Sequence, residues 1–135
     1  MKLYMLDTNI CIYLIKKKPI SYFETLAKLS RNNNFAISSI VLAELQYGVA
    51  NSSRKEGSQI DLNLLTSKLE ILPYTEECAF YYGEIRRDLK QQGLMIGSND
   101  LLIASHALYK NAVLVTNNSS EFHRVKDLAT ENWNY

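Results

Sequence analysis

Cysteine and histidine are scarce in this sequence, with two of each among 135 residues. Cys11 and Cys78 are far apart, and neither has a cysteine or histidine nearby at ligand spacing, which argues against a disulfide framework and against a zinc site. His106 and His123 are interpreted as surface residues or as hydrogen-bonded core residues. The scarce residues therefore give no sign of redox, zinc or histidine-based chemistry.

Long hydrophobic runs are also absent. No apolar stretch approaches the roughly 18 uncharged residues of a membrane span. The N-terminus begins like a signal peptide, but Asp7, Thr8 and Asn9 interrupt its apolar stretch and no small-residue cleavage site follows. We therefore expect a cytoplasmic protein with no membrane association.

The composition is that of a soluble globular domain, with 47% hydrophobic and 21% charged residues. There is no repeat, low-complexity segment or Pro/Gly-rich linker, so residues 1–135 are expected to form one domain. The net charge is +1, but a site that gathers four acids would leave basic residues in excess elsewhere. The basic groups at 16–18, 54–55 and 86–90 are either ordinary solvated surface or a surface for a phosphate backbone.

Short apolar strands alternate with helices along the chain. Strands are predicted at 2–6, 35–38, 70–73 and 112–116, with an edge strand in 128–135. Helices are predicted from a cap at Thr8 or Asn9 to 17, from Pro19 to 31, from a cap at Ser38 or Ser39 to 50, and at 59–69, 75–92 and 98–111, with loops at 32–34 and 51–58. This alternation predicts βαβ units and a mainly parallel central sheet.

Polar residues follow two of the buried strands. Asp7 comes directly after the first strand, and Thr116, Asn117 and Asn118 come after the strand AVLVT. In parallel sheets, functional sites lie beyond the carboxyl ends of the strands. The two polar clusters are therefore expected on the functional edge of the sheet.

Three acids occupy places that need an explanation. On a helix, Glu44 has only Ile40, Val41, Tyr47 and Gly48 as neighbours three and four residues away, so it lies on an apolar face without a local partner. A partly exposed glutamate at the edge of that face is the simpler alternative. Asp7 and Asp100 have simple alternatives too, as a helix cap and as an acid in a first helical turn.

Taken together, the acids indicate a metal site. Gathered carboxylates repel one another unless a cation is present, and no Lys or Arg adjoins Asp7, Glu44 or Asp100 in the sequence. Mg²⁺ prefers carboxylate oxygens, water and substrate phosphate as ligands. Such an ion can activate water and stabilise charge on a phosphate.

Four stretches carry a resemblance to a known family: MLDTNICIYLI, SSIVLAELQYG, IGSNDLLIASHAL and LVTNNSSEFHRV. In this order they resemble PIN-domain ribonucleases, and the VapC-type toxins of bacterial toxin–antitoxin pairs in particular. The resemblance implies a three-layer α/β/α fold and RNA cleavage that depends on Mg²⁺ or Mn²⁺. It also implies inhibition of translation, a homodimer, a VapB-like antitoxin, and contact with DNA only through that antitoxin. The IGSND stretch resembles members that cut tRNA in the anticodon region, initiator tRNA especially.

Carried over by position, the resemblance implies an acidic site of Asp7, Glu44, Asp100 and Glu121. Asp7 and Asp100 would be the main metal ligands, Glu44 would bind the metal or orient water, and Glu121 would lie at the rim. Many PIN domains have an aspartate two residues after the threonine of LVTNN, where this chain has Asn118. Whether Glu121 or Asn118 completes the site is therefore open.

Residues beside the acids are expected to support them. Thr8, Asn9, Thr116 and Asn118 would hydrogen-bond the carboxylates. The tyrosines at 13, 22 and 47 belong either to the core or to surfaces for a second copy or an antitoxin.

Two other functions fit parts of the pattern. One is an aspartyl phosphatase, which would usually place a second aspartate where this chain has Asn9. The other is a catalytically inactive PIN fold that binds RNA or protein.

Overall fold

Five short strands form one fully parallel sheet in the computed structural model, which describes residues 1–133. In spatial order they are β3 (Glu70–Leu72), β2 (Asn34–Ser38), β1 (Leu3–Leu6), β4 (Val113–Val115) and β5 (Ala129–Glu131). Met5 of β1 pairs with Ala36 on one side and Leu114 on the other. This central position explains why β1 is apolar without alternation, since both of its faces are covered.

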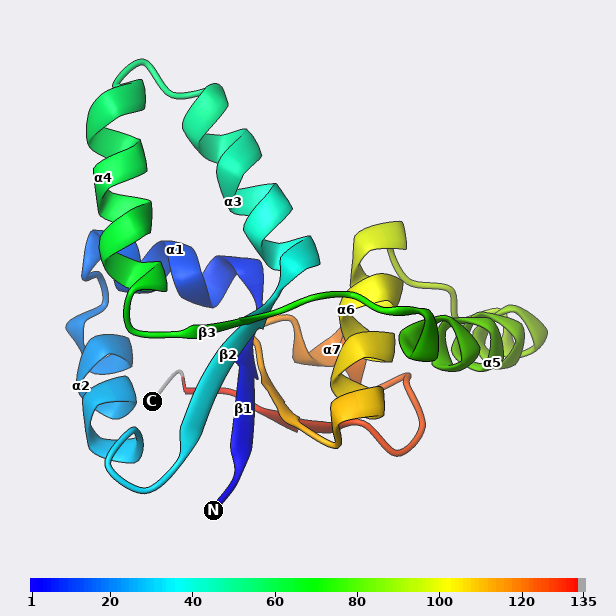
Figure 1. Cartoon of the computed structure of the whole chain (residues 1–135). Coiled ribbons are helices and arrows are strands. Elements are labelled where there is room, and N and C mark those ends of the chain that lie inside the picture. The colour runs from blue at the N-terminus through cyan, green and yellow to red at the C-terminus, as the bar shows by residue number, and fades with distance from the viewer. Residues whose placement is uncertain (134–135) are drawn as a thin grey trace.

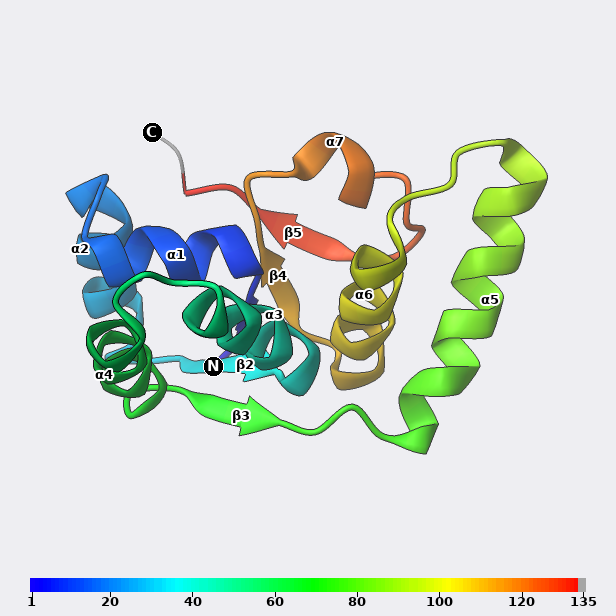
Figure 2. The same cartoon turned by 90° about the horizontal axis from the view of Figure 1, so that it is seen from above.

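Helices cover both faces of the sheet. They are α1 (Thr8–Lys16), α2 (Ile20–Leu29), α3 (Ser39–Ala50), α4 (Lys55–Thr66), α5 (Glu76–Gln92), α6 (Ser98–Lys110) and α7 (Ser119–Phe122). Figure 2 shows α1, α2 and α4 on one side of the sheet and α5 and α6 on the other. In Figure 1, α3 and α4 extend together beyond the sheet at the upper left as an arm, and α5 projects to the right. The predicted three-layer α/β/α fold is confirmed.

The strand order reverses direction at β1. The chain first builds β1, β2 and β3 outward on one side, then crosses to the other side of β1 to add β4 and β5. The carboxyl ends of β1 and β4 therefore lie side by side at a topological switch point, where ligands bind in open parallel sheets. Asp7 and Thr116 are the first residues after these two strands.

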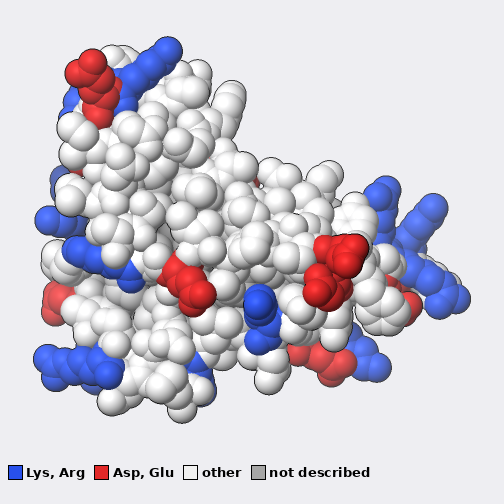
Figure 3. Space-filling view, in the orientation of Figure 1, with Lys and Arg blue, Asp and Glu red and all other residues white. Residues whose placement is uncertain are grey.

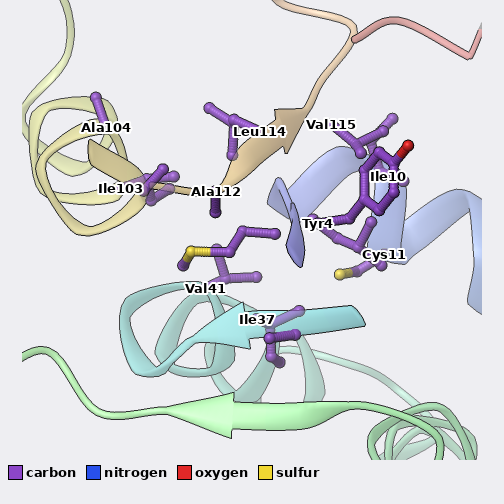
Figure 4. Close-up of a cluster of buried hydrophobic side chains, with 14 of the residues drawn as sticks. Tyr4, Ile10, Cys11, Ile37, Val41, Ile103, Ala104, Ala112, Leu114 and Val115 are labelled. Atoms are coloured by element: carbon purple, nitrogen blue, oxygen red, sulfur yellow. The ribbon is translucent and has the colours of Figure 1, made fainter. Parts of the chain in front are cut away.

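The core is built from the strands and the inward faces of the helices. Leu6, Ile37 and Leu114, from three neighbouring strands, are completely buried. Figure 4 shows side chains of α3 and α6, among them Val41 and Ile103, converging on the strand side chains. These two helices, which carry Glu44 and Asp100, are thus anchored to the same core.

Most predicted elements are confirmed, with shifted ends. The cap of α1 is Asp7, whose carboxylate accepts the backbone N–H of Thr8; the prediction of Thr8 or Asn9 as the cap is wrong. Ser38 caps α3, and Gly93, with a φ of 69°, ends α5 as predicted. The predicted edge strand is present at β5, while residues 134–135 lie outside the described residues.

The fourth helix begins earlier than predicted. The sequence predicts a polar loop at 51–58 and a helix at 59–69, but α4 runs from Lys55 to Thr66. Leu62 and Leu65 are buried. Their burial stabilises the helix, so its polar first turn forms at the surface despite Gly57 and Ser58. Within residues 1–133, no helix combines the length and apolar character needed to cross a bilayer.

A neutral polar cluster lies between α3 and α6. We call Ser38, Tyr74, Ser105 and His106 the histidine cluster. His106 is fully buried, with Nδ1 2.7 Å from Ser38 Oγ, and the Tyr74 hydroxyl lies 2.8 Å from Ser105 Oγ. The interpretation of His106 as a hydrogen-bonded core residue holds for Nδ1, whereas Nε2 has no hydrogen-bond partner among the described residues. Burial lowers its pKa to about 4, and nearby Lys110 adds to the effect.

Candidate active site

Four acids from four different elements meet at the carboxyl-end edge of the sheet. Asp7 follows β1, Glu44 lies in α3, Asp100 opens α6 and Glu121 lies in α7. We call these four side chains the acid site. The prediction that they come together depends on the parallel sheet, because only then do the ends of β1 and β4 share one edge.

Asp7 is buried, with 6% of its surface exposed. One carboxylate oxygen accepts the Thr8 backbone N–H at 2.8 Å, and the other accepts the Thr116 hydroxyl at 2.7 Å. Burial raises the pKa of Asp7, the two hydrogen bonds oppose this rise, and the charge of Glu44 adds to it. Asp7 is thus the cap of α1, and burial and the charge of Glu44 disfavour its ionised form.

Glu44 has hydrogen-bond partners that its own helix does not supply. The Thr8 hydroxyl donates to Oε1 at 2.7 Å, and Asn99 Nδ2 donates to Oε2 at 3.3 Å. Asn99 was missed as a site residue in the sequence. Its position directly before Asp100, in the first turn of α6, was the available signal.

Asp100 and Glu121 share a hydrogen bond between their carboxyl groups. Burial, this hydrogen bond, and the charges of Asp7, Glu121 and Glu44 together raise the pKa of Asp100 to about 7. Because every other acid of the site contributes, the four carboxyl groups form one electrostatic unit. A divalent cation bound among these groups would offset the repulsion that helps to raise the pKa of Asp100.

Asn118 forms hydrogen bonds with Glu121 and with Thr116, the residue that donates to Asp7. Its backbone N–H donates to Thr116 Oγ1 at 2.9 Å, and its Nδ2 donates to Glu121 Oε2 at 3.1 Å. The short helix α7 therefore places residues 118 and 121 together.

Asn9 lies elsewhere. It is exposed, and within residues 1–133 it is not among the donors to the four acids. Consecutive helical residues point about 100° apart, so Thr8 and Asn9 cannot both face the site. Of the predicted supporting residues, Thr8, Thr116 and Asn118 contact acids. The neighbouring Asn117 instead donates to the Tyr13 hydroxyl at 2.8 Å.

Basic side chains stay away from the acid site. Among the described residues, the single ion pair joins Lys2 to Glu131, at 4.0 Å. In Figure 3, Lys and Arg lie at the tip of the α3–α4 arm, along the left edge, low in the middle of the view and at the far end of α5, and none shows on the upper surface between the two arms. Arg54 and Lys55 lie at that tip, and Arg86, Arg87 and Lys90 lie in the C-terminal half of α5.

The side chains of the acid site fit a hard divalent cation by chemistry. They offer carboxylate oxygens, and their neighbours Thr8, Thr116 and Asn118 add hydroxyl and amide oxygens, all of which Mg²⁺ and Mn²⁺ prefer. Within residues 1–133, no three acidic, histidine or cysteine side chains converge tightly enough to hold one ion as they stand. The acids instead turn towards the hydroxyl and amide groups around them, and Asp100 turns towards Glu121.

Comparison with known proteins decides the family. The PIN domain family matches residues 4–128, almost the whole chain. The chain belongs to the PIN-domain family.

Relatives of this PIN domain are VapC ribonucleases. It is 59% identical to ribonuclease VapC2 of Rickettsia felis over 97% of this chain and 98% of that protein. It is 40% identical to the tRNA(fMet)-specific endonuclease VapC of Shigella flexneri, over 96% of this chain and 97% of that protein. The crystal structure of VapBC2 from Rickettsia felis bound to a promoter DNA fragment has a chain with a TM-score of 0.94 and 58% identity, covering 97% of this chain and 98% of that one. This PIN domain is therefore a ribonuclease of the VapC toxin type, as the motifs predicted.

Proposed function

We propose that this PIN domain is a metal-dependent endoribonuclease of the cytoplasm that cleaves tRNA and thereby inhibits translation. The observation that carries the proposal is the acid site, in which four carboxyl groups meet at the switch point without a basic partner among the described residues. The relative from Shigella flexneri that is named for tRNA(fMet) supports initiator tRNA as the preferred substrate. The cut is proposed to lie in the anticodon region.

Asp7 and Asp100 would hold the cation, Mg²⁺ or Mn²⁺. When bound, the ion lowers the pKa of water and stabilises charge that develops on the scissile phosphate. Glu44 either binds the ion or orients the attacking water, and Glu121 contributes from the rim.

The surrounding donors fix where the acids point. Thr116 holds one oxygen of Asp7, and Thr8 and Asn99 hold the two oxygens of Glu44. Such supporting hydrogen bonds orient ligating carboxylates and influence activity. Metal binding needs the ionised form of Asp100, whose pKa is raised to about 7, so cleavage is expected to rise with pH through the region of pH 7.

A VapB-like antitoxin is the proposed protein partner. The chain has the fold of the toxin in the VapBC2 complex, and that complex holds promoter DNA. We propose that this PIN domain forms a homodimer and reaches DNA only through the antitoxin. Since an unscreened acidic site attracts cations, an Arg or Lys of the antitoxin is expected near Asp7, Glu44 and Asp100. An apolar antitoxin segment would follow the helices that carry Tyr13 and Tyr22.

Cleavage of purified tRNA tests the function. The protein is incubated with unfractionated tRNA in Mg²⁺, in Mn²⁺ or in EDTA, with Asp7→Asn as the control variant. A discrete cut that EDTA prevents is expected, and sequencing of the new RNA ends identifies the tRNA and the position of the cut.

Two other outcomes would contradict the proposal. Retained tRNA binding with no cut in either metal would indicate an inactive binding module. Hydrolysis of p-nitrophenyl phosphate without RNA cleavage would indicate a phosphatase.

A further inference from the structure

An open pocket of about 580 Å³ lies between α3 and α6, directly beside the acid site. One end is polar and consists of Thr8, Glu44 and Asn99. Thr8 and Asn99 both donate to Glu44, so this end of the pocket is one wall of the acid site. Whatever occupies the pocket therefore lies next to the place proposed for the scissile phosphate.

The rest of the pocket is apolar. Ile40, Ala43 and Tyr47 follow Glu44's face of α3 at helical spacing, and Leu102 faces them from α6. Tyr47 has 72% of its surface exposed, which is unusual for a large aromatic side chain. In contrast, Tyr13 and Tyr22 stack on each other at 5.1 Å. Within residues 1–133, no ring pair or hydrogen bond engages the Tyr47 side chain.

The surroundings of Tyr47 favour RNA over a protein as the occupant. The exposed neighbours on α3 are Ala43, Gln46, Gly48 and Ala50, and none of them is a large apolar side chain. Protein interfaces bury several large side chains together, and a carboxylate such as that of Glu44 is costly to cover with apolar surface. A nucleobase needs only one aromatic face, and RNA-binding proteins commonly stack unpaired bases on such rings.

We infer that the pocket between α3 and α6 binds one nucleobase of the RNA, next to the phosphate that is cleaved, and that this base stacks on Tyr47. The inference rests on the proposed ribonuclease function and adds to it a site for reading the substrate. It makes Tyr47 a residue that binds and positions RNA, while the chemistry stays with the acids.

Three variants test the inference. Tyr47→Ala removes the stacking face, Tyr47→Trp keeps it and adds a fluorescent ring, and Phe80→Ala is the matched control. Phe80 is 66% exposed but lies on α5, away from the pocket. Binding of unfractionated tRNA is measured in EDTA, so that no cleavage occurs, and KM and kcat are measured in Mg²⁺.

The expected result is selective. Tyr47→Ala weakens tRNA binding at least tenfold, which corresponds to about 1.4 kcal/mol, and raises KM more than it lowers kcat. Tyr47→Trp keeps the affinity, and tRNA quenches its emission. The native tryptophan, Trp133, is 1% exposed and gives a constant background. Phe80→Ala behaves as the wild type.

Three results would overturn the inference. One is a Tyr47→Ala variant that binds tRNA as the wild type does, and another is a Tyr47→Trp emission that tRNA leaves unchanged. The third is a Tyr47→Ala variant with altered oligomeric state and unaltered RNA binding, which would assign Tyr47 to a protein interface. Failure of the proposed function itself is distinguishable, because then the wild type neither binds nor cuts tRNA.

Discussion

Two polar regions lie between α3 and α6: the acid site at the start of α6 and the histidine cluster further along the same helix. In the histidine cluster, hydrogen bonds join Ser38 to His106 and Tyr74 to Ser105, and burial holds the pKa of His106 at about 4, so the cluster is neutral at pH 7. In the acid site, like charges face one another, and the pKa of Asp100 rises to about 7.

The contrast separates two uses of buried polar groups. A neutral, hydrogen-bonded cluster can hold two helices at a fixed distance, because it adds specific contacts without repulsion. Gathered acids oppose folding and are retained only where they bind something. We therefore expect the histidine cluster to fix the position of α3 relative to α6. This position brings Glu44 of α3 and Asp100 of α6 into the same site.

The largest effect is expected from removing an acid. Asp7→Asn or Asp100→Asn should lower the rate of tRNA cleavage at least a thousandfold, about 4 kcal/mol of transition-state stabilisation. In EDTA the same variants should melt at the wild-type temperature or above it. A raised folded pKa means that stability is lost as pH rises from about 4 through 7, so the gain from Asp100→Asn should be larger at pH 8 than at pH 5.

Cleavage kinetics and melting curves at the two pH values check this prediction. Either variant cutting tRNA at the wild-type rate while folded and able to bind metal would remove its acid from the site.

The histidine cluster should show the opposite dependence on pH. The folded pKa of His106, about 4, lies below the ordinary 6.5. The unfolded chain therefore takes up a proton below pH 6.5 while the folded chain does not, and stability falls as pH drops from 6.5 to 4. This loss should reach about 3 kcal/mol.

The variant His106→Phe should lack this loss, while His123→Ala, at an exposed position, should keep it. Urea unfolding at pH 7, 5.5 and 4.5 measures both. Equal pH dependence in wild type and His106→Phe would contradict the assignment.

A smaller effect is expected at the rim of the acid site. Glu121→Gln should lower cleavage about tenfold, or about 1.4 kcal/mol, which is less than the effect of Asp7→Asn because water can replace a rim ligand. Asn118→Ala should also reduce the rate, since it removes the hydrogen bond to Glu121. The reverse pattern, with Glu121→Gln normal and Asn118→Ala inactive, would mean a site of three acids and an amide.

The smallest effect is expected from Tyr74→Phe. The change removes one hydrogen bond, worth about 1 kcal/mol, and Ser105 keeps its bond to the Leu102 carbonyl. The ring contact between residue 74 and His106 does not involve the hydroxyl, so the variant keeps it. Urea unfolding should show the loss with tRNA cleavage unchanged, and a loss of activity would mean that the two regions are more tightly coupled than we propose.

Much of the fold was predictable because local patterns determine it. The unalternating run LYML and the β-branched run AVLV indicate buried parallel strands, and Gly93 ends α5 as expected. The start of α4 was not predictable, because burial of Leu62 and Leu65 outweighs weak local preferences. Nor does spacing alone show that Tyr47 is exposed, since that depends on what packs against α3.

The acids of the candidate site could be proposed from the sequence, but their partners could not. Glu44 was recognised as an acid without a local partner, which holds within its own helix. Its actual donors, Thr8 and Asn99, are 36 and 55 residues away in the chain. Only the folded topology brings such distant groups together, and the same is true of His106 and Ser38, which are 68 residues apart.

The strand order also bears on when during synthesis this toxin becomes active. β1 leaves the ribosome first, yet β4 pairs with it only much later, and 109 residues separate Asp7 from Thr116. Asp7 and Glu44 are therefore made long before Asp100 and Glu121 can join them. An incomplete nascent chain lacks Asp100 and Glu121, which are half of the acid site. We therefore expect the nuclease to stay inactive until nearly the whole chain has been translated, so that it does not stop its own synthesis.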